Sequence, residues 1–266
     1  MAGGVTAVRP TAPVRLSDML AADQIERLLV VMAHPDDVDF GSAGTIATLT
    51  AQGVPVTYCL VTDGDAGGFD HSVSRAEMAS MRRKEQTAAA AVVGVHDLIF
   101  LGHPDGRVVA DLALRRDISR VIRQVRPTVV LGQSPERNYD RIFASHPDHL
   151  ATGEATMCAV YPDARNPFAF PELLEEGHEP WSVRELWLST HPEVSDVVDV
   201  TDMIERKLEA LMCHATQHQD PAATEARVRH WMAASAQTPW LAERIMIRYL
   251  AWLEMIVWTA GKERTV

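Results

Sequence analysis

Two short segments of the sequence combine histidine with aspartate in a way that suits a metal ion. The first is His34-Pro-Asp-Asp37 and the second, far along the chain, is His146-Pro-Asp-His149. Zinc favours nitrogen and oxygen ligands, and catalytic zinc usually keeps three protein ligands and a water molecule. His34 and Asp37 lie close together on a proline-containing turn, and one histidine from the distant segment would complete a His-Asp-His set. Asp36 would then be free to act as a base on the metal-bound water.

The second segment has the pattern of a helix N-terminus. Ser145 or His146 would cap the helix, and Pro147 would occupy its first position. His149 then falls in the first turn, where the helix dipole favours the neutral imidazole that binds metal. A plainer interpretation stays open, because aspartate after a strand often caps a helix. The His-Pro dipeptide also occurs elsewhere, at His103-Pro104 and His191-Pro192.

Strands and helices alternate through the first half of the chain, and these elements would position both segments. Continuous apolar runs predict buried strands, and the stretches between them, which end near Gly or Pro, predict helices. The predicted strands cover 27–33, 56–61, 97–101 and 128–131, and the predicted helices cover 41–53, 75–93 and 112–125. This alternation predicts an α/β fold: a Rossmann-like, mostly parallel sheet with helices on both faces. A strand near 185–189 and helices over 202–217, 223–234 and 241–258 predict a helical C-terminal part.

Polar residues follow four successive predicted strands, and in open α/β sheets functional loops collect at the carboxyl ends of the strands. Asp65 follows the second strand and Asp105 the third, so we expect both to contact a substrate, although a plain surface loop explains Asp65 equally well. Arg82 could hold an anionic or hydroxylated substrate, although a solvated helix face explains it equally well. We expect His214 to line the pocket. His218, four residues later, is interpreted as solvated rather than as a partner of His214 in a second metal site.

The C-terminal part is rich in tryptophan, which large apolar contacts would explain. We interpret these side chains as core or subunit-interface residues rather than as a wall over the pocket, and a homo-oligomer stays open. The residues concerned are Trp231, Trp240, Trp252 and Trp258.

Composition excludes several classes of protein. The chain has 266 residues and a formal net charge of −11, which disfavours binding to nucleic acid or to an anionic membrane. The three cysteines are far apart, without a CxxC pair, which argues against a disulfide framework and fits a reducing cytoplasm. Residues 1–22 do not have the pattern of a signal peptide, and the apolar stretch 249–259 is too short to span a bilayer. We therefore expect a cytoplasmic protein with a flexible tail over 1–25 and a single domain over 26–266.

Four motifs in order resemble the LmbE-like or PIG-L family of zinc-dependent N-acetylglucosaminide de-N-acetylases, which includes mycothiol-pathway relatives. They are Ala33-His-Pro-Asp-Asp37, Gly41-Ser-Ala-Gly-Thr45, Val61-Thr-Asp-Gly64 and His146-Pro-Asp-His149, within a match that runs from about Arg27 to Gln219. One departure is visible, because many members carry Glu where this chain has Val38. That position is not a metal ligand, so we expect the site to be intact.

The resemblance implies a role for each motif residue. One Zn²⁺ per chain would be held by His34, Asp37 and His149, although the same donors would accept iron(II) or another divalent ion. Asp36 becomes the general base. His146 stabilises the oxyanion or protonates the leaving amine, and Asp148 adjusts it.

The implied function is hydrolysis of an N-acyl group, most simply N-acetyl, on a small molecule that contains an amino sugar. An amidase acting on mycothiol-type thiol conjugates is the second hypothesis, since similar motifs occur in both kinds of enzyme. A sugar-binding relative without turnover is the third, and the presence of both a base and an acid disfavours it. A dinucleotide enzyme is also disfavoured, because the first strand leads to His-Pro-Asp-Asp and not to GxGxxG.

Overall fold

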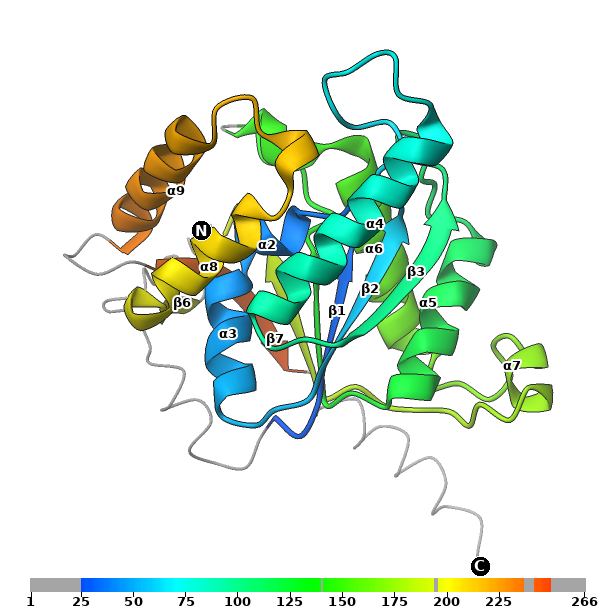
Figure 1. The fold of residues 1–266 in the computed structure, drawn as a ribbon. Helices are drawn as coiled ribbons and strands as arrows, with labels where there is room; N and C mark the ends of the chain where they lie inside the picture. The colour runs from blue at the N-terminus through cyan, green and yellow to red at the C-terminus, as the bar shows by residue number, and fades with distance from the viewer. Residues whose placement is uncertain (1–24, 140, 194–195, 237–241, 250–266) are drawn as a thin grey trace, which may run out of the picture.

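The structure, a computed structural model, describes residues 25–139, 141–193, 196–236 and 242–249. Its centre is a seven-stranded sheet in the order β3-β2-β1-β4-β5-β7-β6 (Figure 1). The first five of these pair in parallel, β7 pairs antiparallel with β5, and β6 pairs antiparallel with β7. The strands are β1 (Leu28–Met32), β2 (Val56–Thr62), β3 (Asp97–His103), β4 (Val129–Gln133), β5 (Glu185–Ser189), β6 (Asp196–Asp199) and β7 (Ala242–Tyr249).

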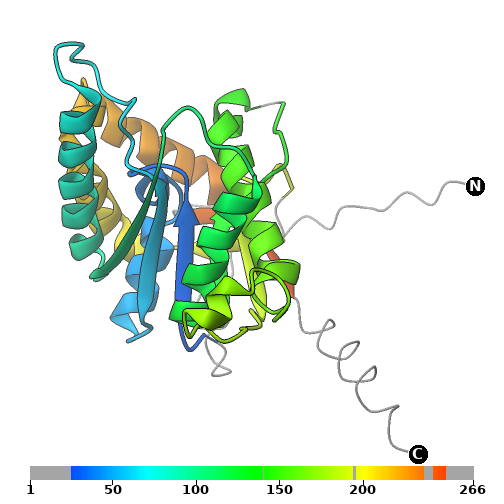
Figure 2. The same ribbon diagram turned by 90° about the vertical axis from the view of Figure 1, so that its right-hand side faces the viewer.

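Helices cover both faces of this sheet, so the expected fold class is confirmed (Figures 1 and 2). One face packs against α3, α4 and α8, and the other packs against α5 and α6. The α-helices are α2 (Asp37–Gly41), α3 (Ala43–Ala51), α4 (Arg75–Val92), α5 (Leu112–Val125), α6 (Pro147–Cys158), α7 (Glu172–Glu175), α8 (Ile204–Met212) and α9 (Pro221–Ala236). Shorter turns are η1 (Ile142–Ser145), η2 (Ala159–Asp163), η3 (Thr201–Met203) and η4 (Ala215–Gln217). None of the described helices is both long and apolar enough to cross a membrane.

The central strand β1 shows why the apolar runs become strands. All five of its residues are buried, and successive side chains point to opposite faces of the sheet. Leu28, Val30 and Met32 join the core on one face, whereas Leu29 and Val31 join the core on the other. A strand that is buried on both faces needs a continuous apolar run rather than an alternating one.

The C-terminal part differs from the sequence prediction in two places. The helix expected over 241–258 is wrong where the structure describes it, because Ala242–Tyr249 forms strand β7 between β5 and β6. Its local sequence contains good helix formers, but pairing with two distant strands overrides that preference. The helix expected over 202–217 is also shorter, since α8 ends at Met212 and a separate 3-10 turn follows. Residues 250–258 and the tail expected over 1–25, apart from Ile25, lie outside the described residues.

The sheet changes direction between β1 and β4, which are neighbours in the sheet but far apart in the sequence. From β1 the chain moves outward through β2 to β3, and from β4 it moves the other way to β5. Such a switch point opens a crevice at the carboxyl ends of the two strands. The first histidine motif follows β1, and the second forms the N-terminus of α6, beyond the end of β4.

Candidate metal centre

Three side chains from the two motifs meet at this switch point. Nδ1 of His34 lies 3.2 Å from Nε2 of His149 and 3.3 Å from Oδ2 of Asp37. Nε2 of His149 lies 3.0 Å from Oδ1 of Asp37. Donor atoms around a tetrahedral ion with bonds of about 2.0–2.2 Å are separated by about 3.3–3.6 Å. The spacing of these three side chains, hereafter the donor trio, therefore fits one small divalent ion.

A second arrangement of donors shares two members of this trio. His34, His146 and His149 each place a ring nitrogen within 4.8 Å of the other two. Their ring centroids are 5.0–5.3 Å apart. His146 is exposed and Asp37 is largely buried, so the two candidates for the third ligand differ in accessibility.

The far side of the His34 ring is held by two carboxylates. Its Nε2 lies 3.1 Å from Asp105 and 3.2 Å from Asp148. Burial lowers the pKa of His34, but the carboxylates of Asp37, Asp105 and Asp148 outweigh it and raise that pKa to about 12. Carboxylates that accept the second N–H of a metal-binding histidine fix its orientation and increase its basicity. The excess of negative charge around this ring also suits a cation.

These contacts place Asp105 and Asp148 differently from the sequence expectation. Asp105 was expected to contact a substrate, but its side chain is buried and accepts hydrogen bonds from His34 and from the backbone N–H of Ala66 at 3.0 Å. Asp148 was expected to adjust His146. Its carboxylate instead accepts the backbone N–H groups of Gly106 and Val108, at 2.7 and 3.2 Å, and faces His34.

His146 caps α6, as the sequence suggested. Its Nδ1 accepts the backbone N–H of Asp148 at 3.2 Å, and Pro147 begins the helix. Burial and the charges of His34 and His149 lower the pKa of His146. Because Nδ1 is the acceptor, the proton of the neutral ring is on Nε2. His146 is an exposed residue, and its Nε2 is therefore a hydrogen-bond donor.

Asp36 sits beside the trio in an unusual backbone conformation. Its φ is 88°, in the left-handed region that few residues other than glycine adopt. Its backbone N–H donates to Oε1 of Gln86 at 2.8 Å, and its Oδ2 accepts from Arg82 at 2.9 Å. Burial raises the pKa of Asp36 to about 6, against the lowering effect of Arg82. A carboxyl group that titrates near neutrality suits a general base.

Arg82 is buried against the polypeptide rather than open to a ligand. Its guanidinium donates to Asp36, to the carbonyl of Pro35 and, at 3.1 Å, to the carbonyl of Gly64. A Cβ atom at Gly64 would lie 2.3 Å from Nη1 of Arg82, and one at Gly67 would lie 2.6 Å from it. The glycines after β2 therefore make room for this guanidinium. The sequence predicts that Arg82 contacts a substrate or lies on a solvated helix face, but its side chain is buried and donates to Asp36.

The two remaining predicted substrate contacts are also held by neighbours within the protein. Asp65 pairs with Nε of Arg75 at 2.6 Å. Burial raises the pKa of Asp65, but the hydrogen bonds from Arg75 and from the backbone N–H of Asp105 outweigh it, and the pKa is lowered. His214 has no exposed surface, and its Nε2 lies 2.8 Å from Oδ2 of Asp39. It begins the turn after α8, so its burial follows from the early end of that helix.

Gln133 is a site residue that sequence reasoning missed. It is the last residue of β4, where it donates from Nε2 to Asp37 at 3.0 Å and accepts the backbone N–H of Ala33 at 3.0 Å. The amide thus fixes Asp37 relative to the end of β1. The sequence feature that could have indicated it is a polar residue at the end of the apolar run that forms β4.

A buried ion pair between Lys207 and Glu243 was also missed. Nζ of Lys207 lies 2.7 Å from Glu243 and donates to the carbonyls of Asp39 and Phe40 at 2.9 Å. Glu243 in turn accepts the backbone N–H groups of Gly44 and Thr45, and the Thr45 hydroxyl, at 2.6–3.0 Å. The pair links β7 and α8 to the end of α2 and the start of α3, which is the segment that follows Asp37.

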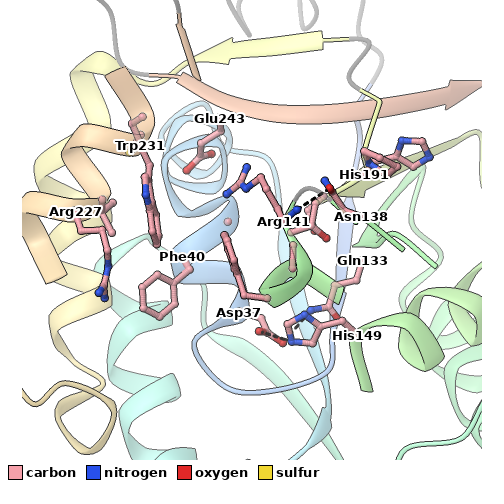
Figure 3. Close-up of a pocket in the computed structure, with 18 of the residues that line it drawn as sticks. Asp37, Phe40, Gln133, Asn138, Arg141, His149, His191, Arg227, Trp231 and Glu243 are labelled. Carbon is pink, nitrogen blue, oxygen red and sulfur yellow. Dashed lines mark hydrogen bonds and ion pairs between the residues drawn. The ribbon is translucent and has the colours of Figure 1, made fainter. Parts of the chain in front are cut away.

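The donor trio opens into a pocket of about 410 Å³ (Figure 3). Asp37 and His149 lie side by side at one end of it, whereas Arg227 and Trp231 project from α9 on the other side. Its further walls come from α2, from the segment before α6 and from the segment after β5. The lining residues from these walls include Phe40, Asn138, Arg141, Phe143, His191 and Pro192.

Comparisons with known proteins point in one direction. The family model described as PIG-L, GlcNAc-PI de-N-acetylase, matches residues 29–160, which include the donor trio and Asp36. A diacetylchitobiose deacetylase of Thermococcus kodakarensis is 33% identical over 199 residues, covering 73% of this chain and 71% of that protein. The 1D-myo-inositol 2-acetamido-2-deoxy-alpha-D-glucopyranoside deacetylase of Rhodococcus erythropolis is 30% identical over 243 residues, covering 72% of this chain and 81% of that protein.

A solved structure agrees with these sequence matches. The N,N'-diacetylchitobiose deacetylase from Pyrococcus horikoshii, complexed with its inhibitor MPG, matches with a TM-score of 0.79 at 29% identity. The match covers 88% of this chain and 90% of that chain, and so includes most of the sheet and its helices.

Proposed function

Because this chain belongs to the PIG-L (LmbE-like) family of de-N-acetylases, we propose that it hydrolyses the N-acetyl group of a small molecule containing an amino sugar. The products are acetate and a free amine. The observation that carries this proposal is the donor trio with a separate carboxylate, Asp36, beside it. A binding protein has no need of that fourth group, whereas amide hydrolysis needs a base.

We propose that His34, Asp37 and His149 hold one divalent ion, and that this ion is Zn²⁺. Two imidazoles and a carboxylate are a donor set common in catalytic zinc sites. Such an ion supplies Lewis-acid chemistry, because it polarises a carbonyl group and makes a water molecule more acidic. Asp105 and Asp148 support the proposal, since both accept from the face of His34 that points away from the trio.

In this proposal Asp36 moves the protons. It accepts one from the water molecule that attacks the acetamide carbonyl, and returns it to the nitrogen, because an amide anion leaves poorly. Arg82 and Gln86 fix its carboxylate and its backbone N–H, so the base needs little reorganisation during the reaction. Its pKa of about 6 lets it exchange protons near neutral pH.

We assign His146 to the oxyanion. Its proton is on Nε2, because Nδ1 accepts from the N-terminus of α6. A neutral imidazole held in this way donates a hydrogen bond to the negative charge that develops on the carbonyl oxygen. The lowered pKa of His146 favours this role over donation of a proton to the leaving amine.

The test is a release assay on zinc-loaded protein. N-acetylglucosamine, N,N'-diacetylchitobiose and an N-acetylated thiol conjugate are incubated separately, and acetate and free amine are measured. We expect equimolar acetate and amine from an amino sugar, and no release from the Asp36→Ala variant. The proposal would be contradicted if the zinc-loaded protein hydrolysed only the thiol conjugate, or if it hydrolysed none of the three compounds.

We also propose that the protein acts in the cytoplasm. All three cysteines, Cys59, Cys158 and Cys213, are free, which suits a reducing compartment. Measuring the protein in separated cell fractions would check this.

A further inference from the structure

Two arginine side chains and two aromatic rings form one group at the mouth of the pocket, hereafter the mouth cluster. Phe143 and Trp231 are nearly parallel, with ring centroids 6.1 Å apart and an interplanar angle of 15°. The guanidinium of Arg141 lies 5.1 Å from the Phe143 ring, and that of Arg227 lies 5.4 Å from the Trp231 ring. All four line the same pocket as Asp37 and His149 (Figure 3).

The mouth cluster is open to solvent although its rings are large and apolar. Phe143 is 63% exposed and Trp231 is 38% exposed. Burial of such rings is normally favourable, so aromatic faces left open beside a pocket mark a surface that a ligand covers. Each ring also restrains a guanidinium by a cation–π contact, which orders the charge before a ligand arrives.

Charges elsewhere in the pocket lining are compensated by neighbours. Lys207 pairs with Glu243, His191 faces Glu136 at 3.5 Å, and Asp37 is part of the donor trio. Neither arginine of the mouth cluster has such a partner: among the described residues, neither lies in an ion pair with a carboxylate. Arg141 bonds through its backbone to Asn138, and Arg227 has a weak contact with Thr224 at 3.4 Å.

Two positive charges that pair with no carboxylate of the described residues stand out at one pocket in a chain with a net charge of −11. The guanidinium group recognises carboxylates and phosphates through paired N–H donors. A neutral sugar could accept hydrogen bonds from these groups but offers no negative charge to pair with them, so an anionic ligand gains more from their position.

We infer that the group attached to the amino sugar, its aglycone, is anionic and that Arg141 and Arg227 bind it. This inference rests on the proposed function for the position of the amino sugar at the donor trio. The aglycone carries a carboxylate or a phosphate at one end, and its chain lies against the rings of Phe143 and Trp231. The mouth cluster therefore selects the substrate, whereas the trio and Asp36 perform the hydrolysis.

The experiment compares N-acetylglucosaminides that differ only at the end of the aglycone. The 2-carboxyethyl and 2-phosphoethyl glycosides are the anionic probes, and the 2-carbamoylethyl glycoside is a neutral probe of nearly the same shape as the carboxylate. Affinity is measured by titration calorimetry on the zinc-loaded Asp36→Ala variant, and turnover is measured as acetate release by the wild type. Binding is thus observed whether or not hydrolysis occurs.

Three substitutions test the assignment in the same two assays. They are Arg141→Gln, Arg227→Gln and, as a matched control, Arg165→Gln. Arg165 also lies over an aromatic ring, that of Tyr161 at 5.7 Å, but does not line the pocket. We expect at least one anionic probe to bind roughly tenfold more tightly than the neutral probe, as two partly exposed ion pairs allow.

The expected pattern is specific to charge. Each mouth variant should lose roughly threefold or more of the preference for the anionic probe over the neutral probe, while Arg165→Gln keeps the full preference. Equal binding of charged and neutral probes when both mouth arginines are intact, or a preference that survives when Arg141→Gln and Arg227→Gln are combined, would overturn the inference. Tight, arginine-dependent binding without acetate release by the wild type would support the mouth cluster and count against the proposed hydrolysis.

Discussion

The donor trio and the mouth cluster are two ends of one pocket, and they are built in opposite ways. At the metal end, His34 is fixed by Asp148, Asp37 by Gln133 and the neighbouring Asp36 by Arg82. At the mouth the rings are exposed, and the guanidinium groups lie over aromatic rings instead of pairing with a carboxylate of the described residues.

This difference indicates how the two ends divide their tasks. Catalytic groups must be held within a fraction of an ångström, which requires buried and hydrogen-bonded support. Exposed residues can be exchanged at little cost in stability, so the mouth can adapt to different aglycones while the chemistry stays the same. Substitutions at the two ends should therefore have effects of very different size.

The largest effect is expected at the base. Asp36→Ala removes the proton acceptor but none of the trio, so turnover should fall by roughly two to four orders of magnitude while bound zinc stays at one equivalent. Asp63→Ala is the matched control, because Asp63 pairs with Arg83 outside this network. Acetate release and metal content measure both variants. Near-normal turnover of Asp36→Ala would remove the distinction between the two ends of the pocket.

A large effect on stability is expected where the buried pair supports α2 and α3. Lys207→Met leaves the carboxylate of Glu243 buried without its cation, which should lower the free energy of unfolding by about 3 kcal/mol or more. Arg229→Met is the control. Its ion pairs with Glu205 and Glu225, at 2.8 and 2.9 Å, are nearly as short but lie at the surface, so their loss should cost no more than about 1 kcal/mol. Urea unfolding measures both. Similar losses in the two variants would show that burial of the pair is unimportant.

An intermediate effect is expected at the glycine that accommodates Arg82. In Gly64→Ala the new Cβ would displace the guanidinium that holds Asp36, so kcat should fall by roughly tenfold or more. Gly53→Ala is the control for backbone strain. Both glycines have a positive φ, 84° at Gly53 and 66° at Gly64, but a Cβ at Gly53 would have no atom within 4 Å. Both variants should lose about 1 kcal/mol of stability, and only Gly64→Ala should lose turnover. Equal turnover in the two variants would show that the position of Arg82 does not affect catalysis.

The smallest effects are expected at the mouth. Arg141→Gln and Arg227→Gln should change the free energy of unfolding by less than about 0.5 kcal/mol, because both side chains are exposed and make no buried contact. Hydrolysis of a neutral N-acetyl amino sugar should stay within about threefold of the wild type. Urea unfolding and acetate release measure these values. A decrease of more than about 1 kcal/mol in the free energy of unfolding would show that these arginines stabilise the fold.

The parts of the molecule that could be predicted from sequence are those whose cause is local. The run that forms β1 is apolar throughout because both faces are buried, and the histidine motif follows it directly. The cap at His146 also depends only on its neighbours, Pro147 and Asp148. The alternation of strands and helices then places both motifs at the same sheet edge.

The parts that could not be predicted depend on distant partners. The segment that forms β7 looks helical by itself, and only pairing with β5 and β6 makes it a strand. Arg82 has the spacing of a solvated helix residue, but glycines from another loop allow it to be buried. The sequence predicts a substrate contact for Asp105 and an effect on His146 for Asp148. Nothing in the two segments themselves indicates that both carboxylates face His34.

The metal content of two variants tests the central claim most directly. Wild type, Asp37→Ala and His146→Ala are purified, equilibrated with Zn²⁺, dialysed and analysed for zinc per chain. The donor trio predicts one equivalent in the wild type and in His146→Ala, and a loss of most of the zinc in Asp37→Ala. Zinc retained by Asp37→Ala and lost from His146→Ala would contradict the account, because the ion would then be held by the three histidines.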